Sequence, residues 1–248
     1  MKLKNHFILT SILCCIILSF GFRVHAEEKQ YEIPQADFEI ELMEDGSADV
    51  TEEWTLHYTT GSFSRFYKDI YKDVTRLEQY DDIDFKEFCI NGVSCERVYD
   101  TDTRQDYTYY MSEENKLYNM QWYYHAEKET VVYQVKYTIK DVVKETDNNV
   151  ALFCYRYVGK NFDKRVDHIK VKITAPGACK MELRYGEASA EDGGDYILLT
   201  DDYVNGMVKY NVALPADLFD GLTFIPLEDL KKDEQKNNSL TARNMSCF

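Results

Sequence analysis

Apolar and polar residues alternate along most of this chain with a period of two. Phe38, Ile40 and Leu42 alternate with acidic residues, and the alternation resumes after a turn at residues 44–47. It recurs at residues 50–58, 118–124, 131–139, 169–173 and 208–212. A period of two is typical of strands that bury one face and expose the other. The pattern therefore predicts about nine or ten strands in antiparallel sheets, each with one wet face.

These strands predict an all-β fold, an antiparallel β-sandwich of immunoglobulin-like type that covers residues 27–222. A helical period occurs only at residues 227–236, which follow Pro226, and predicts a short helix there. From residue 231 the chain is polar, and it ends in a tail without periodicity, so we expect residues 223–248 to form this helix and a mobile tail. The polar stretches 99–116 and 141–149 are expected to be loops.

The first 26 residues have the three parts of a secretory signal peptide. Two lysines precede an apolar stretch at residues 7–20, and Val24 and Ala26 lie three and one positions before the expected cleavage site. The stretch is shorter than the roughly 20 apolar residues that span a membrane, and no second such stretch follows. We therefore expect cleavage after Ala26 and a mature chain without a membrane span, secreted or held at the cell surface.

The chain is strongly acidic, with a formal net charge of −15. Removing residues 1–26 removes three basic side chains and no acidic one, which changes this charge to −18. Nucleic acid is excluded as a partner, because its binding depends on basic side chains that neutralise phosphates. No zinc motif, nucleotide loop or nucleophile elbow is present, so we expect no cofactor. Acidic clusters leave calcium open as an alternative, but none has an EF-hand spacing, and solvated loops are the preferred interpretation.

Cys89 and Cys95 flank the dipeptide Asn91-Gly92, which is the strongest short signal for a β-hairpin. Residues that face each other across two strands have their Cβ atoms close enough for a disulfide. Such bonds form outside the cytosol. The spacing therefore predicts a disulfide between Cys89 and Cys95 in the exported protein.

The other mature cysteines are Cys154, Cys179 and Cys247. Cys154 and Cys179 could form a second bridge, but the sequence does not fix the connectivity, and all five thiols could also remain reduced. A Cys-dependent hydrolase using Cys154 and a distant histidine is the enzymatic alternative. A buried strand cysteine is usually inert, so we expect no catalytic residue and no enzymatic activity.

Aromatic residues crowd between positions 107 and 124. Within the strand at 118–124, Tyr118, Trp122 and Tyr124 share the face that we expect to point inward. The candidates for an exposed aromatic surface, which could stack on a sugar ring or a partner, are Tyr107, Tyr109, Tyr110 and Tyr123.

Glu52 breaks the alternation, because it shares a face with Val50, Trp54 and Leu56. A lone carboxylate there would cost several kcal/mol unless it were paired. Arg65 is the candidate partner, since a guanidinium can grip a carboxylate with two hydrogen bonds. We expect this buried ion pair to fix a loop at residues 59–70 against the core; a strand irregularity that turns Glu52 to water is the alternative.

Several of these segments together resemble a known family. They are the turn at Asp45-Gly46, the strand at Val50-Thr51-Glu52, the loop from Gly61 to Arg65, the strand with Tyr133 and Tyr137, and the segment from Gly159 to Pro176. Over about residues 31–215 the chain resembles the N-terminal extracytoplasmic domain of the bacterial predicted membrane protein family called domain of unknown function 2207. The resemblance implies a β-sandwich outside the membrane, no assigned activity, and relatives that continue into membrane spans.

The sequence thus indicates a bacterial, secreted or cell-surface, non-enzymatic β-sandwich that acts as a binding or structural ectodomain. Its expected partner is a protein or a cell-envelope glycan, and neither is specified by any motif. The alternative is a carbohydrate-binding module that uses the aromatic region at residues 107–124.

Overall fold

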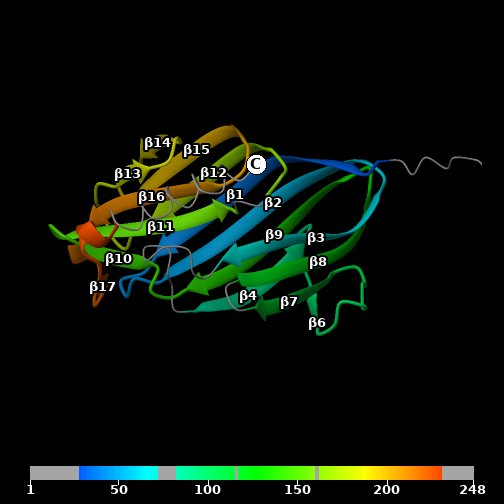
Figure 1. Ribbon diagram of the computed structural model, residues 1–248, viewed down its shortest axis with the longest axis horizontal. Helices are drawn as coiled ribbons and strands as arrows, with labels where there is room; N and C mark the ends of the chain where they lie inside the picture. Colours follow the sequence, from blue (N-terminus) through cyan, green and yellow to red (C-terminus); the bar gives the residue numbers. More distant parts are fainter. Residues whose placement is uncertain (1–27, 72–81, 115–116, 160–161, 231–248) are drawn as a thin grey trace, which may run out of the picture.

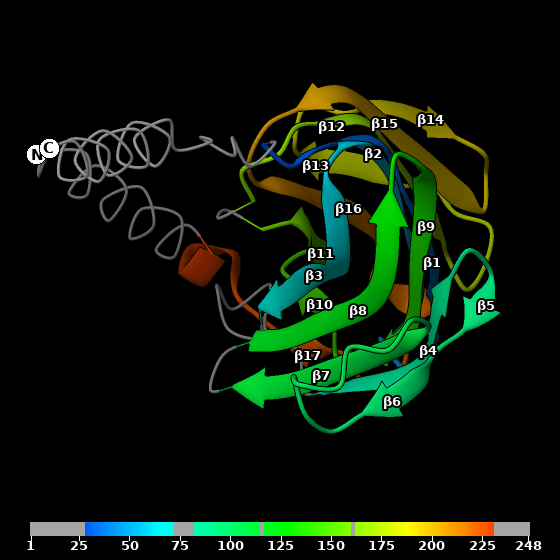
Figure 2. The same cartoon turned by 90° about the vertical axis from the view of Figure 1, so that its right-hand side faces the viewer.

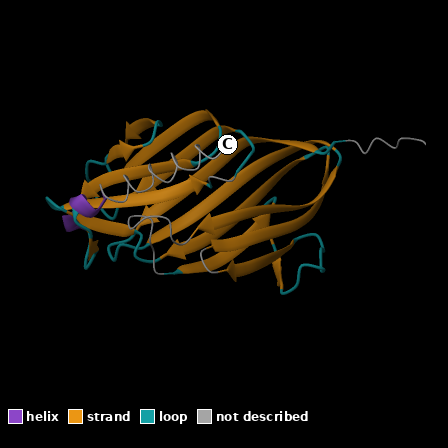
Figure 3. Cartoon of the chain, viewed as in Figure 1, coloured by secondary structure: helices purple, strands orange, loops and turns teal. Residues whose placement is uncertain are grey.

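A computed structural model describes residues 28–71, 82–114, 117–159 and 162–230. In this part of the chain seventeen strands form three sheets, which we call A, B and C (Figure 1). Figure 3 shows that strands make up nearly all of the regular structure and that helix is confined to one end of the molecule. The expected all-β, sandwich-like fold is confirmed.

Sheet A has eight strands in the order β14-β15-β12-β1-β2-β9-β4-β5. In chain order they are β1 (Gln30–Leu42), β2 (Ala48–Thr60), β4 (Ile83–Ile90), β5 (Val93–Ser94), β9 (Thr130–Ile139), β12 (Val166–Thr174), β14 (Ser189–Asp192) and β15 (Tyr196–Val204). The turn between β1 and β2 contains Gly46 at φ +75°, and Gly46 O accepts from the backbone N–H groups of Val142 and Val143. The expected hairpin at Asn91-Gly92 joins β4 to β5, and both residues have the positive φ of a type I′ turn.

Sheets B and C are smaller. Sheet B has the order β3-β8-β7-β6, with β3 (Ser62–Tyr71), β6 (Glu96–Val98), β7 (Thr108–Glu114) and β8 (Leu117–Glu127). Sheet C has the order β13-β16-β11-β10-β17, with β10 (Val143–Thr146), β11 (Val150–Val158), β13 (Glu182–Tyr185), β16 (Val208–Pro215) and β17 (Thr223–Phe224).

The apolar face of sheet A packs against both smaller sheets, and one continuous hydrophobic core results. Figure 2, viewed along the longest axis, shows the three sheets around a common interior. Phe38 of sheet A meets Tyr157 of sheet C with ring centroids 5.0 Å apart, and Tyr133 of sheet A meets Phe66 of sheet B at 4.8 Å. Full burial of such side chains stabilises the fold by about 1.5–3 kcal/mol each.

Three strand pairs depart from the expected antiparallel arrangement. β1 pairs with β12, β6 with β7, and β10 with β17, all in parallel. The alternation of side chains gives no sign of direction, because it is the same in parallel and antiparallel strands. The two stretches expected to be loops were also partly wrong, since β7 lies within residues 99–116 and β10 within 141–149. Their polar composition indicated loops, but β7 pairs with the longer strand β8, and β10 pairs with the longer strand β11.

The fold continues past residue 222, where we expected the domain to end. A 3-10 helix, η2 (Ala216–Leu218), leads to β17, and residues 227–230 are helical, as the period predicted. Ile225 and Leu230 are buried against sheet C, so the expected boundary falls inside a packed segment. The predicted signal peptide, tail and remainder of the helix lie outside the described residues. No helix within the described ranges is long and apolar enough to cross a membrane.

Candidate binding cleft and the buried Glu52 site

Glu52 lies at the point where the three sheets meet, and its carboxylate is fully buried. The Nε1–H of Trp54 donates to Oε2 at 3.1 Å, and the hydroxyl of Tyr155 donates to Oε1 at 3.1 Å. The hydroxyl of Tyr137 and the ammonium of Lys68 are its other donors among the described residues. Trp54 and Tyr137 belong to sheet A, Lys68 to sheet B and Tyr155 to sheet C. One carboxylate therefore joins all three sheets.

The cation paired with Glu52 is Lys68, so the prediction of Arg65 was wrong. Residues 62–71 form strand β3 rather than a loop, and its alternation turns Phe66, Lys68 and Ile70 inward. Arg65 is exposed and donates to Gln121 Oε1 at 3.3 Å. The period-two pattern of Phe66, Lys68 and Ile70 was the available signal, but the expectation of a loop obscured it.

Lys68 is only 6% exposed. Burial lowers the pKa of its ammonium, and the carboxylate of Glu52 opposes that shift. The ammonium also lies 5.4 Å from the ring centroid of Phe38 and 5.2 Å from that of Trp54, where cation–π attraction favours the charged form. Burial, the Glu52 charge and the bond to Tyr155 raise the pKa of Tyr137 well above its usual value, which keeps its hydroxyl protonated as a donor.

A cleft of about 580 Å³ opens beside β3, with Lys68 among its lining residues. This volume lies within the range of about 300–1,000 Å³ that is common for ligand sites. The cleft is bounded by β3, by β1 and β2 of sheet A, and by Val158, Gly159 and residues 162–164. Its aromatic lining consists of Tyr31, Trp54, Tyr58, Phe63, Phe66, Tyr67, Tyr71 and Phe162.

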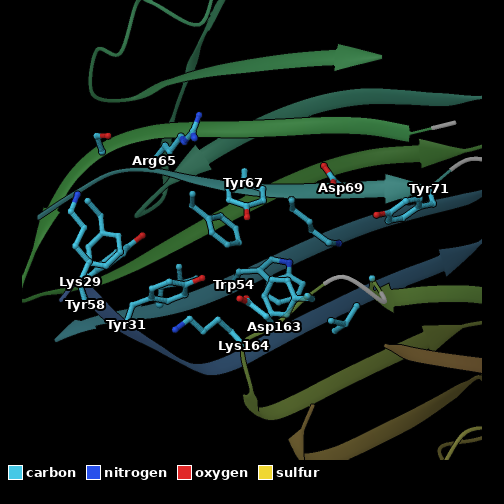
Figure 4. Close-up of a pocket in the computed structure, with 18 residues that line it drawn as sticks. Lys29, Tyr31, Trp54, Tyr58, Arg65, Tyr67, Asp69, Tyr71, Asp163 and Lys164 are labelled. Atoms are coloured by element: carbon cyan, nitrogen blue, oxygen red, sulfur yellow. The ribbon is translucent and has the colours of Figure 1, made fainter. Parts of the chain in front are cut away.

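Charged side chains stand over the aromatic walls of the cleft (Figure 4). The ammonium of Lys29 lies 5.6 Å from the ring centroid of Phe63, and that of Lys164 lies 4.9 Å from the centroid of Tyr31. Burial and the nearby Asp163 raise the pKa of Tyr31 to about 12. Figure 4 shows Arg65 directed away from this group. The cleft thus combines an apolar floor with a polar rim, as ligand sites commonly do.

The aromatic surface expected at residues 107–124 is largely packed into the protein. Tyr123 is fully buried, so its predicted exposure was wrong. It lies outside the core cluster that contains Trp122, and its hydroxyl donates at 3.2 Å to Gln121 Oε1, the same oxygen that Arg65 contacts. Other side chains therefore cover Tyr123 on the face of β8 opposite to Trp122. Tyr109 is half-buried and stacks on Phe88 with ring centroids 3.9 Å apart. Tyr107 meets Tyr124 edge to face at 5.3 Å. Tyr107 and Tyr110 are also half-buried, and no open platform results among these four candidates.

Cys89 and Cys95 are both free thiols in the structure. The hairpin register places Ser94 opposite Cys89, and the N–H of Cys95 donates to Phe88 O at 2.7 Å. The two thiols are close enough for Cys89 to contribute, after burial, to raising the pKa of Cys95 to about 12. The predicted bridge assumed that Cys89 and Cys95 lie directly opposite each other across the hairpin, and they do not. The disulfide therefore stays a prediction.

The described residues give no support to the enzymatic alternative, a Cys-dependent hydrolase that uses Cys154. Cys154 is buried in a cluster with Leu152, Ala213, Ile225 and Leu230 on sheet C. The rings of His57, His125 and His168 are exposed and contact Thr130, Ser62 and Asp202. No group of three or more His, Cys, Asp or Glu side chains within the described ranges is arranged to hold a metal ion.

Comparison with protein families gives a match by sequence. A family model described as the predicted membrane protein (DUF2207) N-terminal domain matches residues 32–244. No curated protein matches the chain.

Several solved structures are similar in shape only. Yeast LTA4 hydrolase is 8% identical with a TM-score of 0.45, over 81% of this chain and 32% of the enzyme. A candidate nutrient binding protein from Legionella pneumophila is 10% identical with a TM-score of 0.44, over 73% of this chain and 66% of that one. An M1 zinc metallopeptidase from Deinococcus radiodurans is 7% identical with a TM-score of 0.40, over 73% and 42%. This chain spans about a third of the yeast enzyme, and likeness at these levels says nothing about activity.

Proposed function

Because the chain belongs to the family of the predicted membrane protein (DUF2207) N-terminal domain, we propose that it is an extracytoplasmic, non-enzymatic ectodomain that binds a partner in the cleft beside β3. The family description and the signal-like first 26 residues support a place outside the membrane. The single observation that carries the binding function is the cleft itself, an aromatic-lined hollow of about 580 Å³ with lysines at its rim.

The wall chemistry supports binding rather than catalysis. Its charged groups include Lys68, which is paired with Glu52, and the rim lysines, which lie over aromatic rings. They also include Asp69, which accepts from Asn119 at 2.6 Å, and Asp163, whose charge acts on Tyr31. Arg65 lines the outer rim and bonds to Gln121. A nucleophile activated by an adjacent base, which covalent catalysis would need, is not among these contacts. Aromatic walls with a few fixed polar groups are instead typical of recognition sites.

The carbohydrate-binding alternative finds less support at residues 107–124, because those rings pack on one another and on Phe88. The cleft offers a glycan more aromatic surface than residues 107–124 do.

Site-specific photo-cross-linking tests this proposal in cells that export the protein. A p-benzoylphenylalanine replaces Tyr67, which is 59% exposed at the rim of the cleft. The matched control carries it in place of Tyr185, which is 51% exposed on β13 and outside the cleft. We expect light-dependent adducts from position 67 and not from position 185. Equal labelling from both positions, or none from position 67, would refute a binding role for the cleft.

A further inference from the structure

Strand β3 presents its edge, rather than one of its faces, to the cleft. Seven consecutive residues, 63–69, line the cleft together with Tyr71. Successive side chains of a strand point to opposite faces, so a cleft that touches all of them must open along the strand's edge. β2 contributes only alternate residues, Trp54, Leu56 and Tyr58, and therefore presents a face.

The edge of β3 that borders the cleft carries backbone groups able to pair with another strand. β3 is the terminal strand of sheet B, and within the described residues it pairs only with β8. An edge strand of ten residues offers a row of N–H and C=O groups that an extended chain can join. Beside this edge, the aromatic and aliphatic floor is spaced every second residue, as the alternate side chains of an added strand are.

The charged residues at the rim of the cleft favour an acidic group on the bound segment. Among the residues that line the cleft, Lys29 and Lys164 lie at the end near Tyr31 and Phe63, where they outnumber Asp163. The charge of Glu129, which is not a lining residue, also acts on Tyr58. Asp69 lies toward the opposite end of β3, as Figure 4 shows. This basic end contrasts with the acidic character of the chain as a whole, and it complements an acidic side chain on the incoming segment.

We infer that the cleft binds an extended segment of a partner protein as an added strand on β3. Alternate apolar side chains of the segment occupy the floor over Trp54, Leu56 and Tyr58, and an acidic side chain meets Lys29 and Lys164. This inference rests on the proposed function and specifies its partner class. Backbone pairing supplies affinity and the alternate pockets supply selectivity.

The test uses peptides selected from a displayed random library on the exported protein. Synthetic copies are titrated by fluorescence anisotropy, and each backbone nitrogen is methylated in turn. Strand addition predicts that methylation weakens binding about tenfold at every second position and little at the positions between, because only alternate N–H groups face β3. Hydrogen exchange should slow in the amides of β3 and stay unchanged in β14, an edge strand of sheet A.

Charge variants locate the bound peptide. The double variant Lys29→Glu/Lys164→Glu should weaken binding at least fivefold, whereas Lys170→Glu, on the exposed outer face of sheet A, should leave it unchanged. Methylation effects without a period of two, or unchanged exchange in β3, would overturn strand addition. Failure of the library to give any peptide that is sensitive to the Lys29→Glu/Lys164→Glu change would overturn it as well.

A glycan array on the same variants separates this inference from the function on which it rests. Glycan binding that depends on Lys29 and Lys164, with exchange in β3 unchanged, would leave the cleft as a binding site and reject strand addition. If neither peptides nor glycans respond to these variants, both the inference and the proposed function fail.

Discussion

Breaking the Glu52–Lys68 pair should destabilise the protein more than almost any other single change of charge. Lys68→Met keeps most of the side-chain volume but leaves a fully buried carboxylate with only neutral donors. Removing one partner of a buried pair typically costs about 3–5 kcal/mol, and we expect Lys68→Met to fall in this range. The bonds from Trp54, Tyr137 and Tyr155 remain, so the lower half of the range is the more specific expectation.

Glu52→Gln should cost less, about 2–3 kcal/mol, because the amide oxygen still accepts hydrogen bonds and buried Lys68 can lose its proton. The lowered pKa of Lys68 reduces the penalty of leaving it without Glu52. In the double variant Glu52→Gln/Lys68→Met neither charge remains, so its loss should be smaller than the sum of the two single losses by about 2 kcal/mol or more.

Denaturant unfolding followed by circular dichroism measures all three variants against the parent protein. Arg65→Ala is the matched control, because Arg65 is a cation on the same strand whose side chain is exposed and bonds to Gln121. Its expected loss is about 1 kcal/mol or less. The reasoning fails if Lys68→Met costs less than about 1 kcal/mol, if Arg65→Ala costs as much as Lys68→Met, or if the double variant is simply additive.

Four further outcomes are expected. Export should remove residues 1–26, and an intact mass that still includes Met1 would contradict this. Peptide mapping of the exported protein without reduction should recover Cys89 linked to Cys95; two free thiols there would reject the bridge. In the reduced, folded protein, alkylation of Cys95 at about pH 8 should be much slower than after unfolding, since burial raises the pKa of this thiol to about 12 and the thiolate is the reactive form. Gly46→Ala should lower stability by about 1–3 kcal/mol, because φ is +75° and the new Cβ would lie 2.6 Å from Leu222 Cδ2; an unchanged unfolding midpoint would contradict this.

Much of the fold followed from local patterns in the sequence. The alternation at residues 131–139 and 169–173 predicted strands β9 and β12, with the inward and outward faces that the structure shows. The dipeptide Asn91-Gly92 predicted a two-residue hairpin, since few other residues adopt positive φ at both turn positions. These features depend on neighbours in the chain, and a single sequence contains them.

The sequence by itself also predicted that Glu52 is buried and paired, because the alternation puts its side chain on the apolar face of a strand, and the structure confirms the burial. It did not determine the partner. The choice between Arg65 and Lys68 depended on whether residues 62–71 form a strand, since a shift of one residue exchanges the inward and outward faces. Only the tertiary structure decided that three sheets converge on this carboxylate and that the edge of β3 borders an aromatic cleft. Both features join residues that are far apart in the chain. A period of two shows which face of a strand is buried, but it does not show which strand lies beside it or in which direction that strand runs.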